Sequence, residues 1–200
     1  MVSYTHIAPL LKASVKGNPN PTIYDPYYCD GSVIGRLGSV GLTDVVNEKK
    51  DCYDVWSKGE EKEYQCFVTN PPYSDDHTER LMKYLCEGGG RGKPWFLLMP
   101  QYVHKHKYYQ QVTRGIRPFY VVPKKRYVYE PPEGFRGKKK SDTHKKSSPF
   151  VSMWYCWGGN EDANRRIMDA WRNGKASGGG RKDTEMAKSK SGLRDLRRKK

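Results

Sequence analysis

Residues 64–73 read Tyr-Gln-Cys-Phe-Val-Thr-Asn-Pro-Pro-Tyr, a strand-forming run that stops abruptly. Residues 64–69 are mostly apolar and β-branched or aromatic, which predicts a buried strand. The strand must end at Asn70, because two consecutive prolines can neither continue a ladder of hydrogen bonds nor enter the interior of a helix. They hold the backbone in a rigid extended bend just beyond the strand.

The bend places three chemical groups at one point. The side-chain oxygen of Asn70 and the carbonyl oxygen of Pro71 are both hydrogen-bond acceptors, and Tyr73 adds a flat ring. Two acceptors can take the two N–H bonds of an NH2 group while the ring stacks on its plane. The pattern therefore predicts a site for a planar amine.

Strand-type and helix-type patterns alternate along the rest of the chain. We expect strands at 22–24, 44–46, 64–69, 95–99, 119–129 and 150–157, and helices at 3–16, 32–40, about 52–56, 75–86, 105–113 and 162–171. This alternation predicts an α/β fold with a mostly parallel sheet flanked by helices and an antiparallel C-terminal strand pair. Ligands of such sheets bind beyond the carboxyl ends of the strands, where residues 25–32 and 70–73 both fall.

Positive charge is concentrated in two segments. The chain has 200 residues and a formal net charge of +15. Residues 124–146 hold nine Lys/Arg against three Asp/Glu, and residues 174–200 hold ten against three. These segments carry 13 of the 15 excess charges, which favours a polyanionic partner and most simply a nucleic acid.

The run Asn70-Pro71-Pro72-Tyr73 resembles the Asn/Asp-Pro-Pro-Tyr/Phe motif of class I S-adenosylmethionine-dependent amino-methyltransferases, the adenine-N6 type in particular. The resemblance implies a Rossmann-like class I methyltransferase fold and S-adenosyl-L-methionine as cofactor. It also implies methyl transfer to an exocyclic base amine, most simply adenine N6 in RNA. The catalytic residues that it implies are Asn70, Pro71, Pro72 and Tyr73.

A second stretch, residues 25–31 (Asp-Pro-Tyr-Tyr-Cys-Asp-Gly), resembles the first motif of that family, Asp-Pro-Phe-x-Gly-x-Gly. The inner glycine is replaced by Cys29 or Asp30, so only Gly31 allows close backbone approach. The resemblance assigns the cofactor's α-amino group to Asp25 and its ribose to the end of the second strand. The implied cofactor-binding residues are Asp25, Pro26, Tyr27, Asp30, Gly31, Asn47 and Glu48.

The interval between Asn47 and Asn70 is too short for the family's third strand and its helix. The adenine of the cofactor would then be bound by residues near Cys52 and Tyr53.

Aromatic residues are interleaved with the cations of the internal basic segment. Lys and Arg can follow phosphates while tyrosine and phenylalanine stack on bases. The expected nucleic-acid-binding residues are Lys124, Lys125, Arg126, Tyr127, Tyr129, Phe135 and Arg136. RNA is favoured over DNA because a base in a single-stranded or looped RNA avoids most of the cost of flipping out of a duplex. No separate target-recognition domain is visible, so RNA structure or a protein partner would have to supply specificity.

We expect a methyltransferase-like domain at 1–173, with a basic insert at about 124–149, followed by a disordered basic tail at 174–200. The five cysteines are dispersed, which favours a reducing compartment. The sequence predicts no metal site and no membrane segment, and its basic clusters favour the nucleus over the cytoplasm. Two alternatives stay open: a catalytically silent RNA-binding subunit, and a protein glutamine amide methyltransferase.

Overall fold

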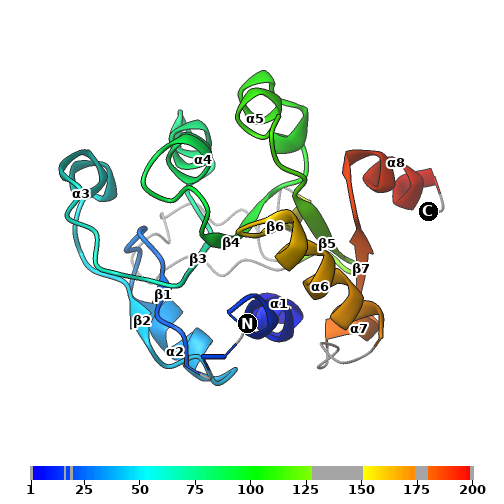
Figure 1. Cartoon of the computed structure of the whole chain (residues 1–200), viewed down its shortest axis with the longest axis horizontal. Helices are drawn as coiled ribbons and strands as arrows, with labels where there is room; N and C mark the ends of the chain where they lie inside the picture. The colour runs from blue at the N-terminus through cyan, green and yellow to red at the C-terminus, as the bar shows by residue number, and fades with distance from the viewer. Residues whose placement is uncertain (1, 16, 19, 128–150, 174–179, 199–200) are drawn as a thin grey trace, which may run out of the picture.

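The computed structural model describes residues 2–15, 17–18, 20–127, 151–173 and 180–198, and Figure 1 shows helices on both faces of one sheet. Within these residues the sheet has seven strands in the order β2-β1-β3-β4-β6-β5-β7. The strands are β1 (Ile23–Tyr24), β2 (Val45–Val46), β3 (Cys66–Thr69), β4 (Pro94–Pro100), β5 (Phe119–Pro123), β6 (Ser152–Gly158) and β7 (Thr184–Ala187). The expected α/β class is confirmed.

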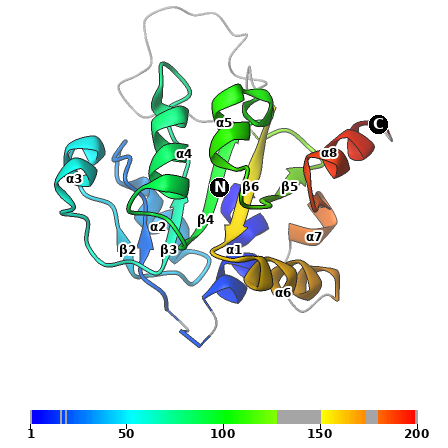
Figure 2. The ribbon, with the colours of Figure 1, turned by 45° about the horizontal axis from the view of Figure 1, so that its top comes forward.

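The helices alternate with the strands along most of the chain. They are α1 (Val2–Ser14), α2 (Ser32–Gly38), α3 (Cys52–Lys58), α4 (His77–Glu87), α5 (Lys107–Val112), α6 (Glu161–Arg172), α7 (Gly180–Asp183) and α8 (Lys190–Arg198), with a short 3-10 helix, η1, at Val103–Lys105. Helices α4 and α5 lie side by side on one face (Figure 2).

The sheet is mixed rather than mostly parallel. Strands β2, β1, β3 and β4 are parallel to one another. Strand β6 inserts antiparallel between β4 and β5, and β7 then pairs antiparallel with β5. The antiparallel part is therefore larger than the single C-terminal pair that the sequence predicts, because β6 pairs along its whole length with β4.

Strand β4 shows how the two cores divide. Phe96 and Leu98 pack with α1, α2 and α6 on one face, and Trp95, Leu97 and Met99 pack with α4 and α5 on the other. Because successive side chains point to opposite faces, a strand covered on both sides must be apolar throughout. This explains the unbroken apolar run that predicts it.

The expectation of a disordered tail from residue 174 is wrong for residues 180–198. They form α7, β7 and α8, and β7 extends the same sheet. Leu193 of α8 is buried against the core that contains α4 and α5, while Arg194 is exposed. The described part of the tail therefore belongs to the domain rather than following it.

The strand expected at 119–129 ends at Pro123. The chain leaves the sheet there, and Tyr127 turns inward to meet His6 of α1, where a hydrogen bond of 2.8 Å joins the Tyr127 hydroxyl to His6 Nδ1. This turn brings the start of α1 close to the end of β5.

Candidate functional site

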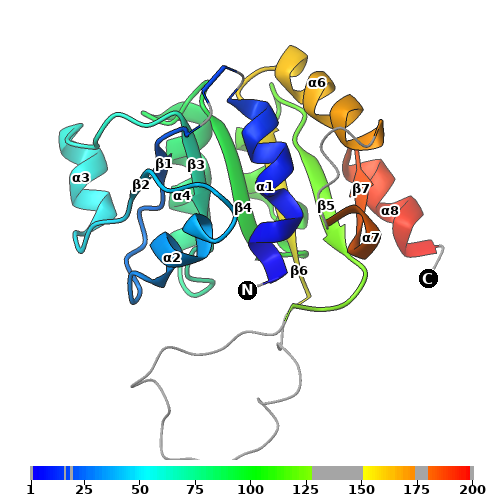
Figure 3. The ribbon, with the colours of Figure 1, turned by 90° about the horizontal axis from the view of Figure 1, so that it is seen from below.

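The two sequence motifs lie next to each other at the carboxyl ends of β1 and β3. The chain runs from β1 outward to β2, and then returns to form β3 on the opposite side of β1. Ligands of open α/β sheets bind in a crevice at such a switch point, beyond the carboxyl ends of the strands, so we call the position between the ends of β1 and β3 the candidate crevice. This edge of the sheet faces the bottom of Figure 3.

Asp25 follows β1 and is almost completely buried, with 5% of its surface exposed. Its Oδ1 accepts a hydrogen bond of 2.6 Å from Thr69 Oγ1, at the end of β3, and one of 3.2 Å from the backbone N–H of Tyr27. Burial raises the pKa of Asp25 to about 7, against these two hydrogen bonds, which lower it. A positively charged ligand group at this point would restore the ionised form.

Asn47 follows β2 and turns toward Asp25. Its Nδ2 donates a hydrogen bond of 2.9 Å to the Asp25 carbonyl oxygen, which fixes the orientation of the amide. Asn47 Oδ1 is buried and has no hydrogen-bond partner. A buried acceptor of this kind is costly unless a ligand donor reaches it.

Glu48 points outward and is engaged by two lysines, with Nζ–carboxylate distances of 3.0 Å to Lys50 and 2.6 Å to Lys62. The hydrogen bonds from Lys62 and Lys50 lower the pKa of Glu48. Of the two expected ribose-binding residues, Asn47 is buried beside Asp25, whereas Glu48 lines the hollow between β2 and α3 together with Lys50 and Lys62.

The turn after β1 uses Gly31 as expected. Gly31 has φ of 73° and precedes α2, so a side chain there would strain the backbone. Asp30 Oδ1 accepts a hydrogen bond of 2.9 Å from the backbone N–H of Ser32, which holds the turn. Hydrogen bonding to the Ser32 side chain, and then to its backbone N–H, lowers the pKa of Asp30. The ring of Tyr28 covers Gly31, since a Cβ placed on Gly31 would lie 3.3 Å from it.

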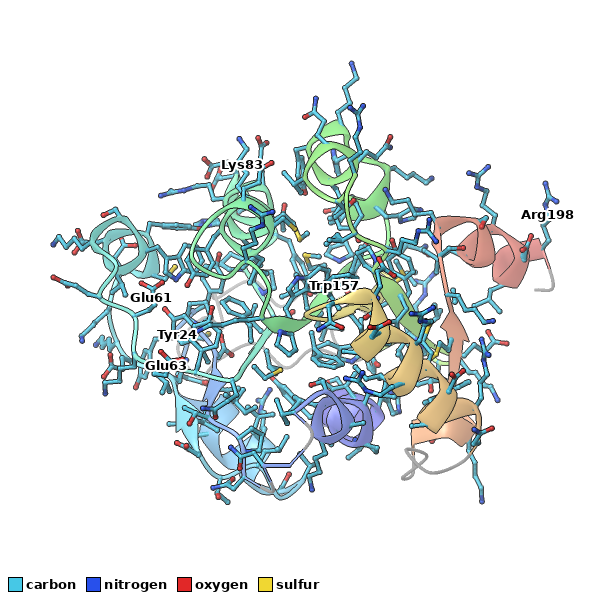
Figure 4. The ribbon with its side chains drawn as sticks, in the orientation of Figure 1. Tyr24, Glu61, Glu63, Lys83, Trp157 and Arg198 are labelled. Atoms are coloured by element: carbon cyan, nitrogen blue, oxygen red, sulfur yellow. The ribbon has the colours of Figure 1, made fainter. Side chains whose placement is uncertain are left out.

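A shallow hollow, open to solvent, lies beside this turn, between β2 and α3. It occupies the side of β2 where the sequence leaves no room for a third strand. Tyr24 and Glu61 lie close together there in Figure 4. The hollow is lined by residues that include Pro26, Val46, Cys52, Val55 and Glu61.

The Asn70–Tyr73 bend has a closed arrangement in this structure. The Tyr73 hydroxyl lies 2.5 Å from Asn70 Oδ1 and 3.1 Å from the Leu98 carbonyl oxygen. One hydroxyl proton cannot serve two acceptors fully, so the nearer Asn70 oxygen is the main acceptor. Asn70 is exposed and Pro71 is buried. The acceptor expected to meet an amine is therefore occupied by a side chain three residues away.

Three polar neighbours of the crevice do not follow from the motifs. The Tyr53 hydroxyl is joined to His77 Nδ1 at 2.5 Å and to the Tyr27 hydroxyl at 3.2 Å. The guanidinium of Arg80 lies 3.3 Å from the centre of the Tyr53 ring. These contacts tie α3 and α4 to the turn after β1. The one sequence signal for a polar contact near this turn is Thr69, a polar residue at the last position of a buried strand, which contacts Asp25.

The expected nucleic-acid-binding residues divide into three groups. Lys124, Lys125 and Arg126 are exposed and follow β5 at the same edge as Asn70. Tyr127 is only 7% exposed and packs in the core against His6, so the prediction that it stacks on bases does not fit its position. Tyr129, Phe135 and Arg136 lie outside the described residues.

Comparison with known proteins gives no family for this chain: no protein-family model matches it, and no curated protein matches it. Among the residues that the structure describes, no group of three or more His, Cys, Asp or Glu is placed to hold a metal ion. None of the helices described is both long enough and apolar enough to cross a membrane.

Proposed function

We propose that this protein is an S-adenosylmethionine-dependent methyltransferase acting on an exocyclic base amine, with adenine N6 in RNA as the favoured acceptor. The observation that carries the proposal is the hydrogen bond of 2.6 Å between Thr69 Oγ1 and Asp25 Oδ1. It joins the two motifs across the crevice between β1 and β3, although 44 residues separate them in sequence.

The crevice fits the cofactor chemically. The buried carboxyl of Asp25 suits the ammonium group of the methionine part, because an opposite charge favours the ionised acid. The unpartnered Oδ1 of Asn47 suits a ribose hydroxyl. The hollow offers Pro26, Val46 and Cys52 to one side of a flat ring, and the rest of its lining is largely charged, with Glu48, Lys50, Glu60, Glu61 and Lys62.

Asn70 and Pro71 carry the proposed chemistry. When bound, the cofactor supplies an electrophilic methyl group on a positively charged sulfur. The amine of a base is a poor nucleophile because its lone pair is delocalised into the ring. Hydrogen bonds from its two N–H groups to Asn70 Oδ1 and the Pro71 carbonyl oxygen favour a pyramidal nitrogen and offset the charge that develops. Tyr73 stacks on the base, and no strong base is required.

A second candidate is the catalytically silent RNA-binding subunit. It is favoured by two contacts, the Tyr73 hydroxyl on Asn70 Oδ1 and the Tyr28 ring over Gly31. Both close the positions that the active enzyme needs open. Each involves one side chain that can rotate away, so an active enzyme requires only that ligands compete with them.

The proposal is tested by calorimetric titration of the chain with S-adenosylmethionine. We expect saturable binding that is lost in Asp25→Ala and retained in Asp54→Ala, which removes an exposed carboxylate of α3. With labelled cofactor, Asn70→Ala should abolish transfer to RNA while cofactor binding persists. A folded protein that does not bind the cofactor supports the silent subunit, and transfer to glutamine peptides but not to RNA supports the amide methyltransferase.

A further inference from the structure

Charge is distributed unevenly along the carboxyl edge of the sheet. The loops after β1, β2 and β3 (25–31, 47–51 and 70–76) hold six Asp/Glu against two Lys. The described parts of the loops after β4 and β5 (101–107 and 124–127) hold five Lys/Arg and no Asp/Glu. The candidate cofactor crevice lies on the acidic half, and Asn70 lies at the boundary. The charge of the basic half thus suits a polyanion.

An aromatic group lies on the basic half, after the strand that pairs with β3. Tyr102 follows β4, the neighbour of β3, and is 38% exposed. Its ring lies 5.7 Å from that of His106 at a steep angle, and the His106 ring stacks on Tyr108 at 5.3 Å. The Tyr108 hydroxyl is hydrogen-bonded to Thr78 Oγ1 at 2.8 Å, at the start of α4. The group is therefore anchored to the helix that follows the Asn70–Tyr73 bend.

Cations flank these rings. Lys105 and Lys107 are exposed on either side of His106. Lys124, Lys125 and Arg126 follow β5, three strand positions from β3 and so about 14 Å away across the sheet. Aromatic faces interleaved with cations are the surface that single-stranded nucleic acids bind, since every base can stack and every phosphate is negative.

We infer that Tyr102, with His106, Lys105 and Lys107, forms a subsite for the nucleotide next to the target base in a single-stranded nucleic acid. The strand runs from Asn70 across the ends of β4 and β6 toward Lys124. A duplex fits less well, because its bases are stacked on one another and are not available to Tyr102. This inference rests on the proposed function for the position of the target base at Asn70. The expectation that Tyr102 binds a single-stranded nucleic acid is independent of the proposed function.

Fluorescence anisotropy with labelled oligouridine tests this subsite without any transfer reaction, because uracil has no exocyclic amine. We expect Tyr102→Ala to weaken binding by about 5- to 100-fold, the effect of losing one base–aromatic stack. Tyr102→Phe keeps the ring and should bind like the unaltered protein. The matched control is Tyr28→Ala, which removes a tyrosine of similar exposure (40%) from the acidic half and should leave binding unchanged.

Several outcomes overturn the inference. The subsite is ruled out if Tyr102→Ala and Tyr28→Ala lose affinity for oligouridine equally. It is also ruled out if Tyr102→Ala loses no affinity while its thermal midpoint is unchanged. Equal affinity for a duplex of the same length removes the single-strand preference. Failure of the unaltered protein to bind oligouridine favours an acidic protein partner for this surface instead. Binding that behaves as expected in a protein that does not bind S-adenosylmethionine keeps the subsite and rejects the proposed transfer.

Discussion

At the scale of single residues, Asp25 links the stability of the protein to its proposed function. Its carboxyl is buried, and the pKa is raised from 3.8 to about 7. A group whose pKa is raised by folding contributes stability that is present below its unfolded pKa and is lost as pH rises through the folded pKa. The cost of keeping Asp25 charged at about pH 8 is on the order of 4 kcal/mol.

We therefore expect Asp25→Asn to stabilise the ligand-free protein at alkaline pH. The asparagine oxygen can still accept from Thr69 and Tyr27, and its NH2 group takes the place of the protonated oxygen. The difference in free energy of unfolding between the variant and the unaltered protein should be near zero at about pH 4 and reach a few kcal/mol at about pH 8. Urea unfolding across this range measures it, and a difference that does not change with pH would contradict the assignment. The same variant should bind S-adenosylmethionine poorly.

Tyr73 gives a second residue-scale prediction, because its hydroxyl and its ring act in opposite directions. The hydroxyl occupies Asn70 Oδ1, whereas the ring is proposed to stack on the base. We expect Tyr73→Phe to keep transfer activity or raise kcat/KM by up to about 5-fold, since a competing hydrogen bond of about 1 kcal/mol is removed. Tyr73→Ala should lower kcat/KM by about 10-fold or more. Equal losses in both variants, measured with labelled methyl, would show that the hydroxyl itself is needed.

At the scale of elements, α8 is the part of the chain that composition describes least well. Its segment is rich in Lys, Arg, Gly and Ser, which predicts disorder. The apolar residues that hold it are few and spaced as on one helix face, with Leu193 buried and Leu196 packed against the same core. The strand β7, which precedes α8, pairs antiparallel with β5 and so supplies partners for the backbone hydrogen-bonding groups on that side of β5. Few apolar residues suffice here because they pack against a core that the rest of the domain already forms.

Two adjacent substitutions distinguish a packed α8 from a disordered tail. Leu193→Ala removes a side chain that is 3% exposed and should lower the free energy of unfolding by about 2 kcal/mol or more. Arg194→Ala alters the neighbouring exposed position and should change it by less than about 0.5 kcal/mol. Urea unfolding reports both values. In a disordered tail neither substitution would matter, so equal and negligible effects would contradict the packing.

The sequence predicts most elements but not how they associate. Apolar runs such as 95–99 and the Gly31 and Pro71 breaks are local signals, and they locate the strands and the two motifs within a few residues. The insertion of β6 between β4 and β5 depends on pairing between distant segments, which no local pattern encodes. The same holds within the site. Asp25 and Asn70 follow from their motifs, whereas the Asp25–Thr69 bond and the inward turn of Tyr127 depend on the assembled sheet.

At the scale of the whole molecule, the division of charge along one edge of the sheet would separate the two proposed binding tasks. The cofactor carries positive groups and would enter on the side of Asp25, while the phosphates of a nucleic acid are attracted to the ends of β4 and β5. The two ligands can then approach Asn70 from opposite sides, and each meets loops whose charge is opposite to its own. A single uniformly basic surface would weaken cofactor binding, and a uniformly acidic one would exclude the substrate.

This division predicts different salt dependences for the two ligands. Affinity for a single-stranded nucleic acid should fall steeply with salt, because each phosphate contact releases counterions, whereas affinity for S-adenosylmethionine should change little. Replacing Lys124, Lys125 and Arg126 together by glutamine removes three exposed cations, and should reduce the slope of log affinity against log salt by about 2 if each contacts a phosphate. Cofactor affinity in this triple variant should be unchanged.

The matched control replaces charges on the other half. Asp51→Asn with Asp75→Asn should leave the salt slope for oligonucleotides unaltered, because these carboxylates flank the cofactor side. An unchanged slope in the triple variant would mean that the phosphate contacts are made by other residues of the chain. A loss of cofactor affinity equal to the loss of oligonucleotide affinity would mean that the two ligands share one surface, and the separation argued from the strand order would then fail.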